Sequence, residues 1–401
     1  MRHFPSLVVP LLGVHLLSSV AAAQPYAYVS EKHSDAVTVI DTATNKVIDT
    51  VDVGQSPSGV AVTPDGRLVF VANSNNHSDS VSVIDATSDD TTADIRVGVN
   101  PLGVAVAPDA AHVYVTNPGS DTVSVIDTTT NLVAATIAVG RSPADVAVTP
   151  DGAWVYVANS QTFTSPAAGN ISVIDAGEQK VVATIAAGNN PFAVAVTPNG
   201  SFAYVTNSNS LDVSGPGSVS VIDVVTRKVV ATIPVGGNPL GVAITPDSQF
   251  AYVTNFSSNS VSIIDTATQS VAHTVHVGNG PLGVALTADG RFAYVANRQP
   301  FNLIAPGSVS VIDTGTLAVV ATIPVGENPT SIAIASASPP ACLGDCNGDG
   351  EVSVDEVITG VNIALGSAPP GTCPAFDTNG DGVVTIAELI TAVTDALDGC
   401  P

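Results

Sequence analysis

The chain has 401 residues, of which 45% are hydrophobic and 11% charged, and 35 acidic against 11 basic side chains give it a formal net charge of −24. So much apolar sequence excludes a disordered chain, and a charged fraction far below the usual value of about 25% favours strands and turns with Ser, Thr, Asn and Gly on the surface. The negative charge excludes nucleic-acid binding, because a phosphate backbone would be repelled and no basic patch compensates.

The first 23 residues predict an export signal. Arg2 supplies a short basic start, residues 7–20 are mainly apolar, and three alanines precede Gln24 as a cleavage site would require. The alternative is a membrane anchor, but Pro10 interrupts the apolar run, and no later segment approaches the ~20 apolar residues of a membrane span. We therefore expect a secreted protein, either extracellular or at the cell surface.

A motif of the form Val-x-Val-Ile-Asp, or close to it, occurs seven times at intervals of 42 to 48 residues. A Gly follows each Asp after 13 residues, and an aromatic residue follows six of these Gly after 16 more. The motifs end at Asp41, Asp85, Asp127, Asp175, Asp223, Asp265 and Asp313. Repeats of this length are typical of propeller blades.

Each repeat predicts four short strands, which we call a, b, c and d. In the third repeat they are residues 103–107, 112–116, 123–126 and 133–139, and turns such as Pro-Asp-Gly connect a to b. Small residues recur in strand a, which is expected for the strand nearest the propeller axis.

The phase of the repeats predicts how the ring closes. The first strand after the signal, residues 26–30, is a strand b, whereas the last, residues 330–335, is a strand a. Pairing of these two strands would complete the first blade and remove an open sheet edge. Residues 24–336 are thus predicted to form an all-β seven-bladed propeller with four-stranded blades.

The start of strand c is preceded in each repeat by a tetrapeptide that resembles the signature of the YVTN family of β-propeller repeat proteins. It reads Tyr-Val-Thr-Asn at residues 114–117, 204–207 and 252–255, and Phe/Tyr-Val-Ala-Asn at 70–73, 156–159 and 294–297. The first repeat departs from it, with Tyr28-Val29-Ser30-Glu31. The resemblance covers residues 26–336 and implies a surface or secreted propeller.

The connection between strands b and c carries all the variation in repeat length. It is long at residues 160–170, 208–218 and 298–308, and short in the other repeats. These b–c loops are expected on the same face as the d–a connections, and insertions gathered on one face commonly mark a binding surface. The long loops include the apolar residues Phe163, Leu211, Phe301, Leu303 and Ile304. Their alternative role is to cover the blade edges.

Polar residues of the d–a connections are candidates for contacting a protein or glycan near the mouth of the central channel. They are Asn100, Arg141, Asn190, Asn238, Asn279 and Glu327. The alternative is that the asparagines are ordinary turn residues. The repeated Asp of each motif is interpreted as structural, because it precedes a Thr/Ser/Gly-rich turn and its carboxylate would accept hydrogen bonds from the backbone N–H groups of that turn. The Asn of the tetrapeptide is interpreted as structural too.

A catalytic arrangement is not evident. His33, His77, His112, His273 and His276 occupy different phases of the repeat, and neither a zinc-binding His-Glu-x-x-His nor a nucleophile elbow occurs. A hydrolase or lactonase site assembled from scattered loop residues stays open as an alternative.

Residues 337–342 form a linker with two prolines, and residues 343–401 differ sharply in composition from the propeller. From residue 341 onward there are ten acidic residues and no Lys or Arg, which suggests neutralisation by a divalent metal ion. Residues 345–356 and 377–388 each match the twelve-residue calcium loop of an EF-hand. The predicted ligands are Asp345, Asn347, Asp349, Glu351, Ser353 and Glu356, and then Asp377, Asn379, Asp381, Val383, Thr385 and Glu388.

Calcium requires this pattern because it binds six to eight oxygens at roughly 2.3–2.6 Å. Side chains at alternate positions converge, Gly at the sixth position permits the sharp turn, the seventh residue offers its carbonyl, and the final Glu binds through both oxygens. We therefore predict two calcium ions. Helices are expected over residues 353–365 and 385–397, and their apolar stripes should pack the pair together. The stripes are Val357, Val361 and Leu365, and Leu389, Val393 and Leu397.

The spacing of the two loops, together with Ile-Ala-Leu-Gly at 363–366 and Ala-Leu-Asp-Gly at 396–399, resembles the dockerin domain over residues 343–399. The resemblance implies a cohesin-like partner, although dockerins mostly end the loop with Asp and have a polar pair before it. Four cysteines lie in this region, Cys342, Cys346, Cys373 and Cys400, and an oxidising location would allow two disulfides whose pairing stays open.

Three functions are compatible with the sequence. The first is a secreted, non-catalytic interaction protein whose propeller face binds a protein or glycan. The second is a propeller hydrolase or lactonase tethered through its C-terminal module. The third is a structural component of a cell surface or matrix.

Overall fold

The computed structural model describes residues 25–75, 78–161, 168–208, 216–298 and 305–335 of the N-terminal part. In the C-terminal part it describes residues 344, 346, 352–369, 372–373, 376, 384–386, 388–390 and 392–393. The chain divides into two compact units, of which one spans Gln24–Ser338 and the other includes Pro339–Pro401.

The first unit is a seven-bladed propeller. Its described residues form 28 strands in seven antiparallel sheets of four strands each. Blades one to four contain, in order from strand a to strand d, β28 (Pro329–Ile334), β1 (Tyr26–Glu31), β2 (Ala36–Asp41) and β3 (Lys46–Asp52); β4 (Pro57–Val62), β5 (Leu68–Asn75), β6 (Ser78–Asp85) and β7 (Asp90–Arg96); β8 (Val104–Val106), β9 (His112–Asn117), β10 (Thr122–Asp127) and β11 (Leu132–Ala138); β12 (Pro143–Val148), β13 (Trp154–Asn159), β14 (Ala168–Asp175) and β15 (Lys180–Asn189). Blades five to seven contain β16 (Pro191–Val196), β17 (Phe202–Asn207), β18 (Ser218–Asp223) and β19 (Lys228–Pro234); β20 (Pro239–Ile244), β21 (Phe250–Asn255), β22 (Ser260–Asp265) and β23 (Ser270–His276); β24 (Pro281–Leu286), β25 (Phe292–Asn297), β26 (Pro306–Asp313) and β27 (Ala318–Glu327).

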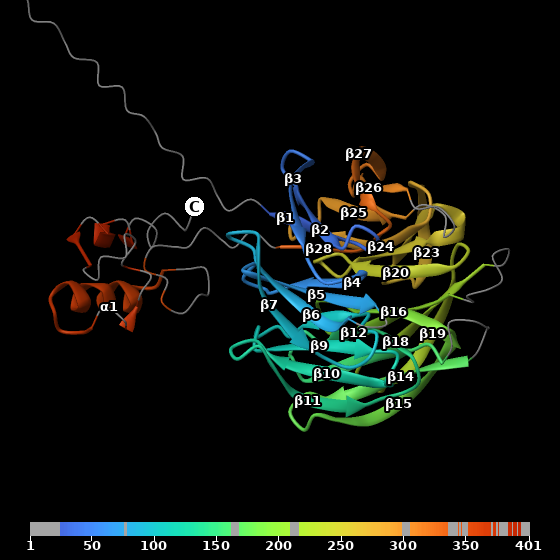
Figure 1. Ribbon diagram of the computed structural model, residues 1–401, viewed down its shortest axis with the longest axis horizontal. Coiled ribbons are helices and arrows are strands. Elements are labelled where there is room, and N and C mark those ends of the chain that lie inside the picture. Colours follow the sequence, from blue (N-terminus) through green and yellow to red (C-terminus); the bar gives the residue numbers. More distant parts are fainter. Residues whose placement is uncertain are drawn as a thin grey trace, which may run out of the picture. The chain divides into compact units, whose positions relative to one another are not determined.

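The blades close into a ring. Each strand a contacts the strand a of both neighbouring blades, from β4 through β8, β12, β16, β20 and β24 to β28 and back to β4. The d strands contact one another in the same cyclic order and lie on the outside (Figure 1). The predicted closure is confirmed, because β28 pairs with β1 in the antiparallel register Ala27↔Ile334 and Val29↔Ile332.

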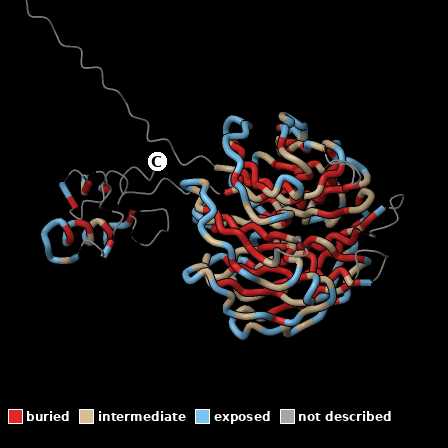
Figure 2. The backbone as a smooth tube through the Cα atoms, in the orientation of Figure 1, coloured by how far each residue is buried: buried red, intermediate tan, exposed pale blue. Residues whose placement is uncertain are grey.

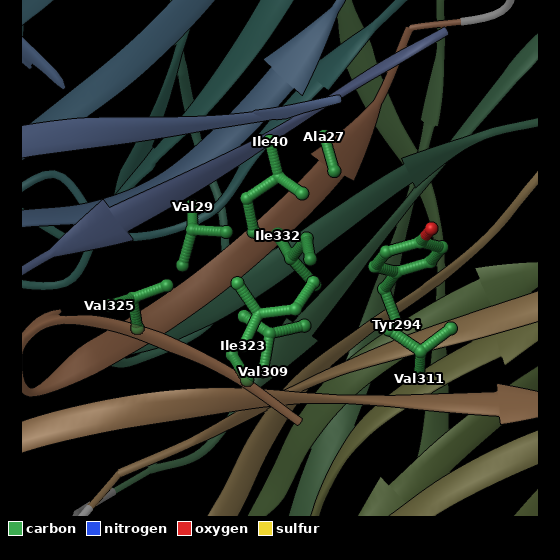
Figure 3. Packing of buried hydrophobic residues seen from close by; sticks show 10 residues of the cluster. Ala27, Val29, Ile40, Tyr294, Val309, Val311, Ile323, Val325 and Ile332 are labelled. Carbon is green, nitrogen blue, oxygen red and sulfur yellow. The ribbon is translucent and has the colours of Figure 1, made fainter. Parts of the chain in front are cut away.

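The hydrophobic core of the propeller lies between blades rather than at its centre. Strands b and c are buried on both faces, as the band of buried residues in Figure 2 shows. At the junction of blades seven and one, Tyr294 packs with Ile323 and Ile332 (Figure 3). The Tyr294 hydroxyl donates to Asn45 Oδ1 at 2.7 Å. Burying each such side chain contributes roughly 1.5–3 kcal/mol, so every pair of blades stabilises the ring.

The repeated Asp of each motif forms the c–d turn, as predicted. Asp127 Oδ1 accepts the backbone N–H groups of Thr129 at 3.0 Å and Thr130 at 2.8 Å. Equivalent bonds occur at the other six motifs. The hydrogen bonds from Thr130 hold the pKa of Asp127 below its usual value. These carboxylates are therefore structural.

The Asn of the tetrapeptide packs against the Gly that recurs 13 residues after each motif Asp, and this close packing accounts for the Gly. Asn117 Nδ2 donates to Ser124 Oγ in strand c at 3.0 Å, which fixes the amide at the end of strand b. A Cβ on Gly98, in the connection from the preceding blade, would lie 2.6 Å from Asn117 Cγ. The same close approach occurs between Gly140 and Asn159 and in four further blades, and in blade one Gly326 meets Glu31 in place of an Asn, so no side chain fits at the Gly position.

The C-terminal unit contains helix α1 (Val354–Ala364), which begins with a capping box formed by Ser353 and Glu356. The propeller itself includes the short 3₁₀ helix η1 (Phe256–Ser258). In the part of the chain that the structure describes, no helix is long and apolar enough to cross a membrane.

The buried face of α1 differs from the predicted stripe. The helix buries Glu356, Gly360 and Ile363, whereas Leu365 is 74% exposed. The reason is Phe376, which packs so close that a Cβ on Gly360 would lie 2.4 Å from its ring. Val361, Val393 and Ile390 are also exposed, whereas Leu389 packs against the small core. That core consists of Ile363, Cys373, Phe376, Val384 and Ala392.

One disulfide joins described cysteines of this unit. Cys346 and Cys373 are linked with an S–S distance of 2.12 Å and a Cα–Cα distance of 5.1 Å. Cys342 and Cys400 lie outside the described residues. The first of the two expected disulfides thus connects the first predicted calcium loop to the segment that precedes the second.

Candidate functional site

The b–c loops and the d–a connections lie on one face of the propeller, as predicted. In blade three, Pro118 has no N–H and Gly119 donates instead to the Val99 carbonyl at 3.0 Å. In the other six blades, the residue that follows the tetrapeptide position donates its backbone N–H to a carbonyl of the d–a connection leading into the same blade. Examples are Ser74 to Ser56 at 3.0 Å, Ser208 to Asn190 at 3.1 Å and Arg298 to Gly280 at 2.9 Å. We call this surface the loop face. Most of the long loops, including Phe163, Leu211, Phe301, Leu303 and Ile304, lies outside the described residues.

The backbone conformation partly explains why Asn occurs at three of the candidate positions. Asn100, Asn190 and Asn238 have positive φ angles of 56°, 45° and 53°, and each directly precedes a Pro. This Pro begins strand a in blades five and six and lies three residues before β8 in blade three. Asn tolerates this left-handed conformation better than most residues. The same position carries Ser56, Ser142, Gly280 and Asn328 in the other blades, all with positive φ. The turn interpretation therefore accounts for these positions.

The six candidates lie on the loop face but differ in accessibility. Arg141 and Asn279 are exposed, Asn100, Asn238 and Glu327 are partly buried, and Asn190 is only 1% exposed. Arg141 and Asn279 are consequently the candidates best placed to contact a ligand. Asn190 serves the packing of the d–a connection, where its carbonyl also accepts from Ser208 Oγ at 3.2 Å.

Sequence reasoning missed an acidic residue in an inner strand. Asp145, in β12 of blade four, occupies the position at which the other six blades have a small residue. The equivalent residues are Gly59, Gly103, Ala193, Gly241, Gly283 and Ser331. Asp145 departs from the pattern of small residues in strand a, and this departure is the feature of the sequence by which it could have been identified.

The Asp145 carboxylate joins two blades. Its Oδ2 accepts the backbone N–H of Val194 in β16 of blade five at 3.0 Å. On the other side, a Cβ on Gly103 of blade three would lie 2.7 Å from Oδ1. Burial raises the pKa of Asp145 to about 6, and the hydrogen bond from Val194 opposes this rise. Asp145 therefore changes its charge in a mildly acidic range where ordinary carboxylates are already ionised.

The described histidines do not form a metal or catalytic cluster. His33 is in a b–c loop, His112 in β9, and His273 and His276 in β23, while His77 lies outside the described residues. Among the residues that the structure describes, no group of three or more His, Cys, Asp or Glu side chains could hold a metal ion.

Of the twelve predicted calcium ligands, four lie within the described residues. Ser353, Glu356, Thr385 and Glu388 are described, whereas Asp345, Asn347, Asp349, Glu351, Asp377, Asn379, Asp381 and Val383 are not. Ser353 and Thr385 each donate a backbone N–H and a side-chain hydroxyl to the final Glu of their loop. The Ser353–Glu356 distances are both 2.8 Å, and the Thr385–Glu388 distances are 2.7 and 2.8 Å.

Both final glutamates are 7% exposed, so each loop buries a carboxylate at the same place. Glu356 Oε1 also accepts the N–H of Cys346 at 2.8 Å, which connects the end of the first loop to its beginning. Oxygen donors and a buried carboxylate suit a hard divalent cation such as calcium.

The sequence matches the family described as YNCE-like beta-propeller over residues 66–339. A solved structure titled hydrazine synthase, from Kuenenia stuttgartiensis, is 26% identical, with a TM-score of 0.64, and the match covers 76% of this chain and 99% of the other. A structure titled dihydro-heme d1 dehydrogenase NirN in complex with DHE is 20% identical, with a TM-score of 0.54 and coverage of 77% and 74%. A functionally unknown protein from Desulfotomaculum acetoxidans is 15% identical, with a TM-score of 0.62 and coverage of 78% and 99%. No curated protein matches the chain.

Proposed function

This chain belongs to the YNCE-like β-propeller family, and from that premise we propose that it is a secreted or cell-surface, non-catalytic interaction protein. Its loop face binds a protein or glycan, and its C-terminal unit binds two calcium ions. The observation that carries the first part is the gathering of all length variation and of the exposed Arg141 and Asn279 on one face. The repeated carboxylates and amides elsewhere are engaged in turns and blade packing, which leaves this face as the variable surface.

The calcium proposal is supported by donor chemistry that recurs in both loops. Asp345, Asn347, Asp349, Ser353 and Glu356 would hold the first ion together with the Glu351 carbonyl, and the equivalent residues from Asp377 to Glu388 would hold the second. Bound calcium would neutralise acids in a region that has no Lys or Arg. We further propose that this unit docks onto a cohesin-like partner.

Isothermal titration with calcium tests the metal proposal on the full chain. We expect two ions per chain in the wild type and one in each of Glu356→Gln and Glu388→Gln, because each change removes the bidentate ligand of one loop. Asp355→Asn, which alters an exposed residue of α1 that is outside the predicted ligand set, is the control and should bind two. Absence of calcium uptake by the wild type would overturn the proposal.

A glycan array and a pull-down from culture medium, each with and without calcium, test the loop face. Arg141→Ala combined with Asn279→Ala should weaken capture at least tenfold, because both exposed side chains lie on that face. Thr44→Ala and Thr129→Ala, on the c–d turns at the opposite ends of the strands, serve as the control and should leave capture unchanged. Equal loss in both double variants would argue against the loop face.

A hydrolase or lactonase is the second candidate function, and Asp145 is the observation that favours it. A carboxylate whose pKa is raised to about 6 is suited to general acid–base work near neutral pH. Activity against a panel of lactones and esters that disappears in Asp145→Asn would support this candidate over the binding protein.

A further inference from the structure

We propose that the Cys346–Cys373 disulfide controls the calcium affinity of the first predicted calcium loop, residues 345–356, so that a thiol reductant weakens binding there. This inference rests on the proposed calcium sites and adds their regulation. The bond joins the second residue of the first loop to a cysteine that lies shortly before the second loop, residues 377–388. The redox state of one pair of sulfur atoms is thereby connected to both loops.

Cys346 also holds the final ligand of its loop. Its backbone N–H donates to Glu356 Oε1 at 2.8 Å, while the N–H and the hydroxyl of Ser353 donate to Oε2, both at 2.8 Å. Glu356 is 7% exposed, so its carboxylate is fixed inside the unit. Because a bidentate Glu acts together with ligands from the start of the loop, the position of Cys346 affects how well the two ends of the loop are aligned for a cation.

The disulfide ties the start of this loop to the small core. Cys373 is fully buried and packs with Ile363 and Phe376. Gly344, which directly precedes the loop, packs against the same ring, since a Cβ there would lie 2.7 Å from Phe376 Cζ. The segment is thus held by close packing at residue 344 and by a covalent bond at residue 346. Reduction would remove the covalent part of this anchoring, and calcium would then have to order the start of the loop on binding.

The second loop contains no cysteine. The residue that corresponds to Cys346 is Thr378, which cannot form a disulfide. Glu388 is nevertheless held in the same way as the final Glu of the first loop, by the N–H and the hydroxyl of Thr385. The second loop begins directly after Phe376, so loosening of the core would reach it only indirectly. We therefore expect reduction to weaken the first site strongly and the second site slightly.

The two sulfur atoms differ in accessibility, which gives the reduction a direction. Cys346 is exposed, whereas Cys373 is 0% exposed. The thiolate of a small dithiol would therefore attack Cys346 Sγ, and the Cys346–Cys373 bond would break with its electron pair passing to Cys373, which takes up a proton. The second thiolate of the reductant would then close its own disulfide and release Cys346 as a thiol. Two electrons and two protons pass from the dithiol to the protein.

Calcium and the disulfide must influence each other equally. If the oxidised protein binds calcium more tightly by some factor, calcium must oppose reduction by the same factor. A disulfide that closes a loop of this length changes an equilibrium constant by about a hundredfold, of which we expect about tenfold to act on calcium, because packing at Gly344 still holds part of the segment. For a two-electron couple, a tenfold change corresponds to a reduction potential that is about 30 mV lower when calcium is present.

Isothermal titration of the full chain with calcium chloride tests the inference. Compared with the oxidised wild type, Cys346→Ser combined with Cys373→Ser should weaken one of the two sites about tenfold and the other by less than about threefold. In a Glu356→Gln background, which lacks the first site, the same two changes should leave the remaining affinity within about threefold. Ser367→Ala, at an exposed position after α1 that is outside both loops, is the control and should keep both wild-type affinities.

Reduction of the wild-type protein provides a second readout that does not require the double variant to fold. The fraction of protein that retains the Cys346–Cys373 disulfide is measured by alkylation and peptide mass analysis in dithiothreitol redox buffers, with calcium or with a chelator. Calcium should move the midpoint of reduction by about 30 mV to lower potential in the wild type. It should have little effect on the midpoint in Glu356→Gln.

Two kinds of failure are distinguishable. Calcium affinities that are the same with and without the disulfide, or a midpoint that calcium leaves unchanged in the wild type, would overturn control by the disulfide and leave the calcium sites themselves intact. Absence of calcium uptake by the oxidised wild type would instead refute the calcium proposal, and this inference with it.

Discussion

Replacing Asp145 by Asn should stabilise the propeller at neutral pH and have little effect in acid. The ordinary pKa of an Asp is 3.8, and burial raises the pKa of Asp145 to about 6. One pKa unit corresponds to 1.36 kcal/mol, so the ionised carboxylate costs roughly 3 kcal/mol in the folded state. Because Asp145 is only partly buried, we expect a gain of about 1–3 kcal/mol for the neutral amide at pH 8.

The sign of the pH dependence follows from proton binding. The folded protein holds the Asp145 proton more tightly than the unfolded chain does, because the folded pKa is the higher one. The contribution of this group to stability is therefore greatest below pH 4, declines as the pH rises toward about 6, and stays at its lower value above that. Asp145→Asn removes the titration, so its advantage should appear between pH 4 and pH 6.

Urea unfolding from pH 3.5 to pH 8 measures this difference, with fluorescence of the chain's one tryptophan, Trp154 in β13 of the same blade, as the probe. Asp151→Asn is the matched control in the a–b turn of the same blade. Hydrogen bonds from Thr149 and Ala153 lower the pKa of Asp151, so this change should destabilise the protein at neutral pH, and the destabilisation should begin to decline only as the pH falls below about 4. A difference between Asp145→Asn and wild type that is constant with pH, or a loss of stability at pH 8, would refute the reasoning.

Three further predictions concern packing, the disulfide and the metal. Gly140→Ala should destabilise the propeller by about 1–3 kcal/mol in urea, because the new Cβ would lie 2.5 Å from Asn159 Cγ, whereas Gly177→Ala, with its nearest contact at 3.5 Å, should change stability by less than about 0.5 kcal/mol. The Cys346–Cys373 disulfide closes a loop of 27 residues. Its reduction should lower the calorimetric melting temperature of the C-terminal unit by an amount equivalent to about 3 kcal/mol. An unchanged melting transition would contradict this prediction. Removal of calcium by a chelator should lower the melting temperature of the C-terminal unit and leave that of the propeller unchanged. Free calcium at 100 times its dissociation constant would stabilise the C-terminal unit by about 2.7 kcal/mol. A shift in the propeller transition alone would count against the calcium loops.

The repeat pattern alone was sufficient to predict the propeller. Seven copies with constant internal intervals determine seven blades, and the phase at the two ends predicts the pairing of β28 with β1 that the structure shows. Strand limits in the third blade agree with the prediction to within two residues, for example β9 at His112–Asn117. Local chemistry sufficed because each blade is specified by its own turns, such as that at Asp127, and repeats the same short-range contacts.

The C-terminal unit was less predictable from its sequence. The motif identifies the candidate ligands, and Glu356 and Glu388 are indeed buried at equivalent places. The buried face of α1 was wrongly predicted, because helical periodicity reveals apolar residues but cannot show that Phe376 packs against Gly360 and leaves Leu365 exposed. A small core of this kind depends on one long-range contact, which no local pattern specifies.

By itself, the sequence determined the number of blades, the closure of the ring and the calcium-loop pattern, since these depend on intervals and on residue types within short segments. Only the tertiary structure decided which polar groups are neighbours. His33 and Asn328 are 295 residues apart in the chain, yet closure of the ring brings them into contact. In the same way, Asp145 meets the Val194 amide only because blades four and five lie next to each other at the axis. The interaction between two charges depends on their separation in space and on how far burial excludes water, and neither quantity can be read from position along the chain.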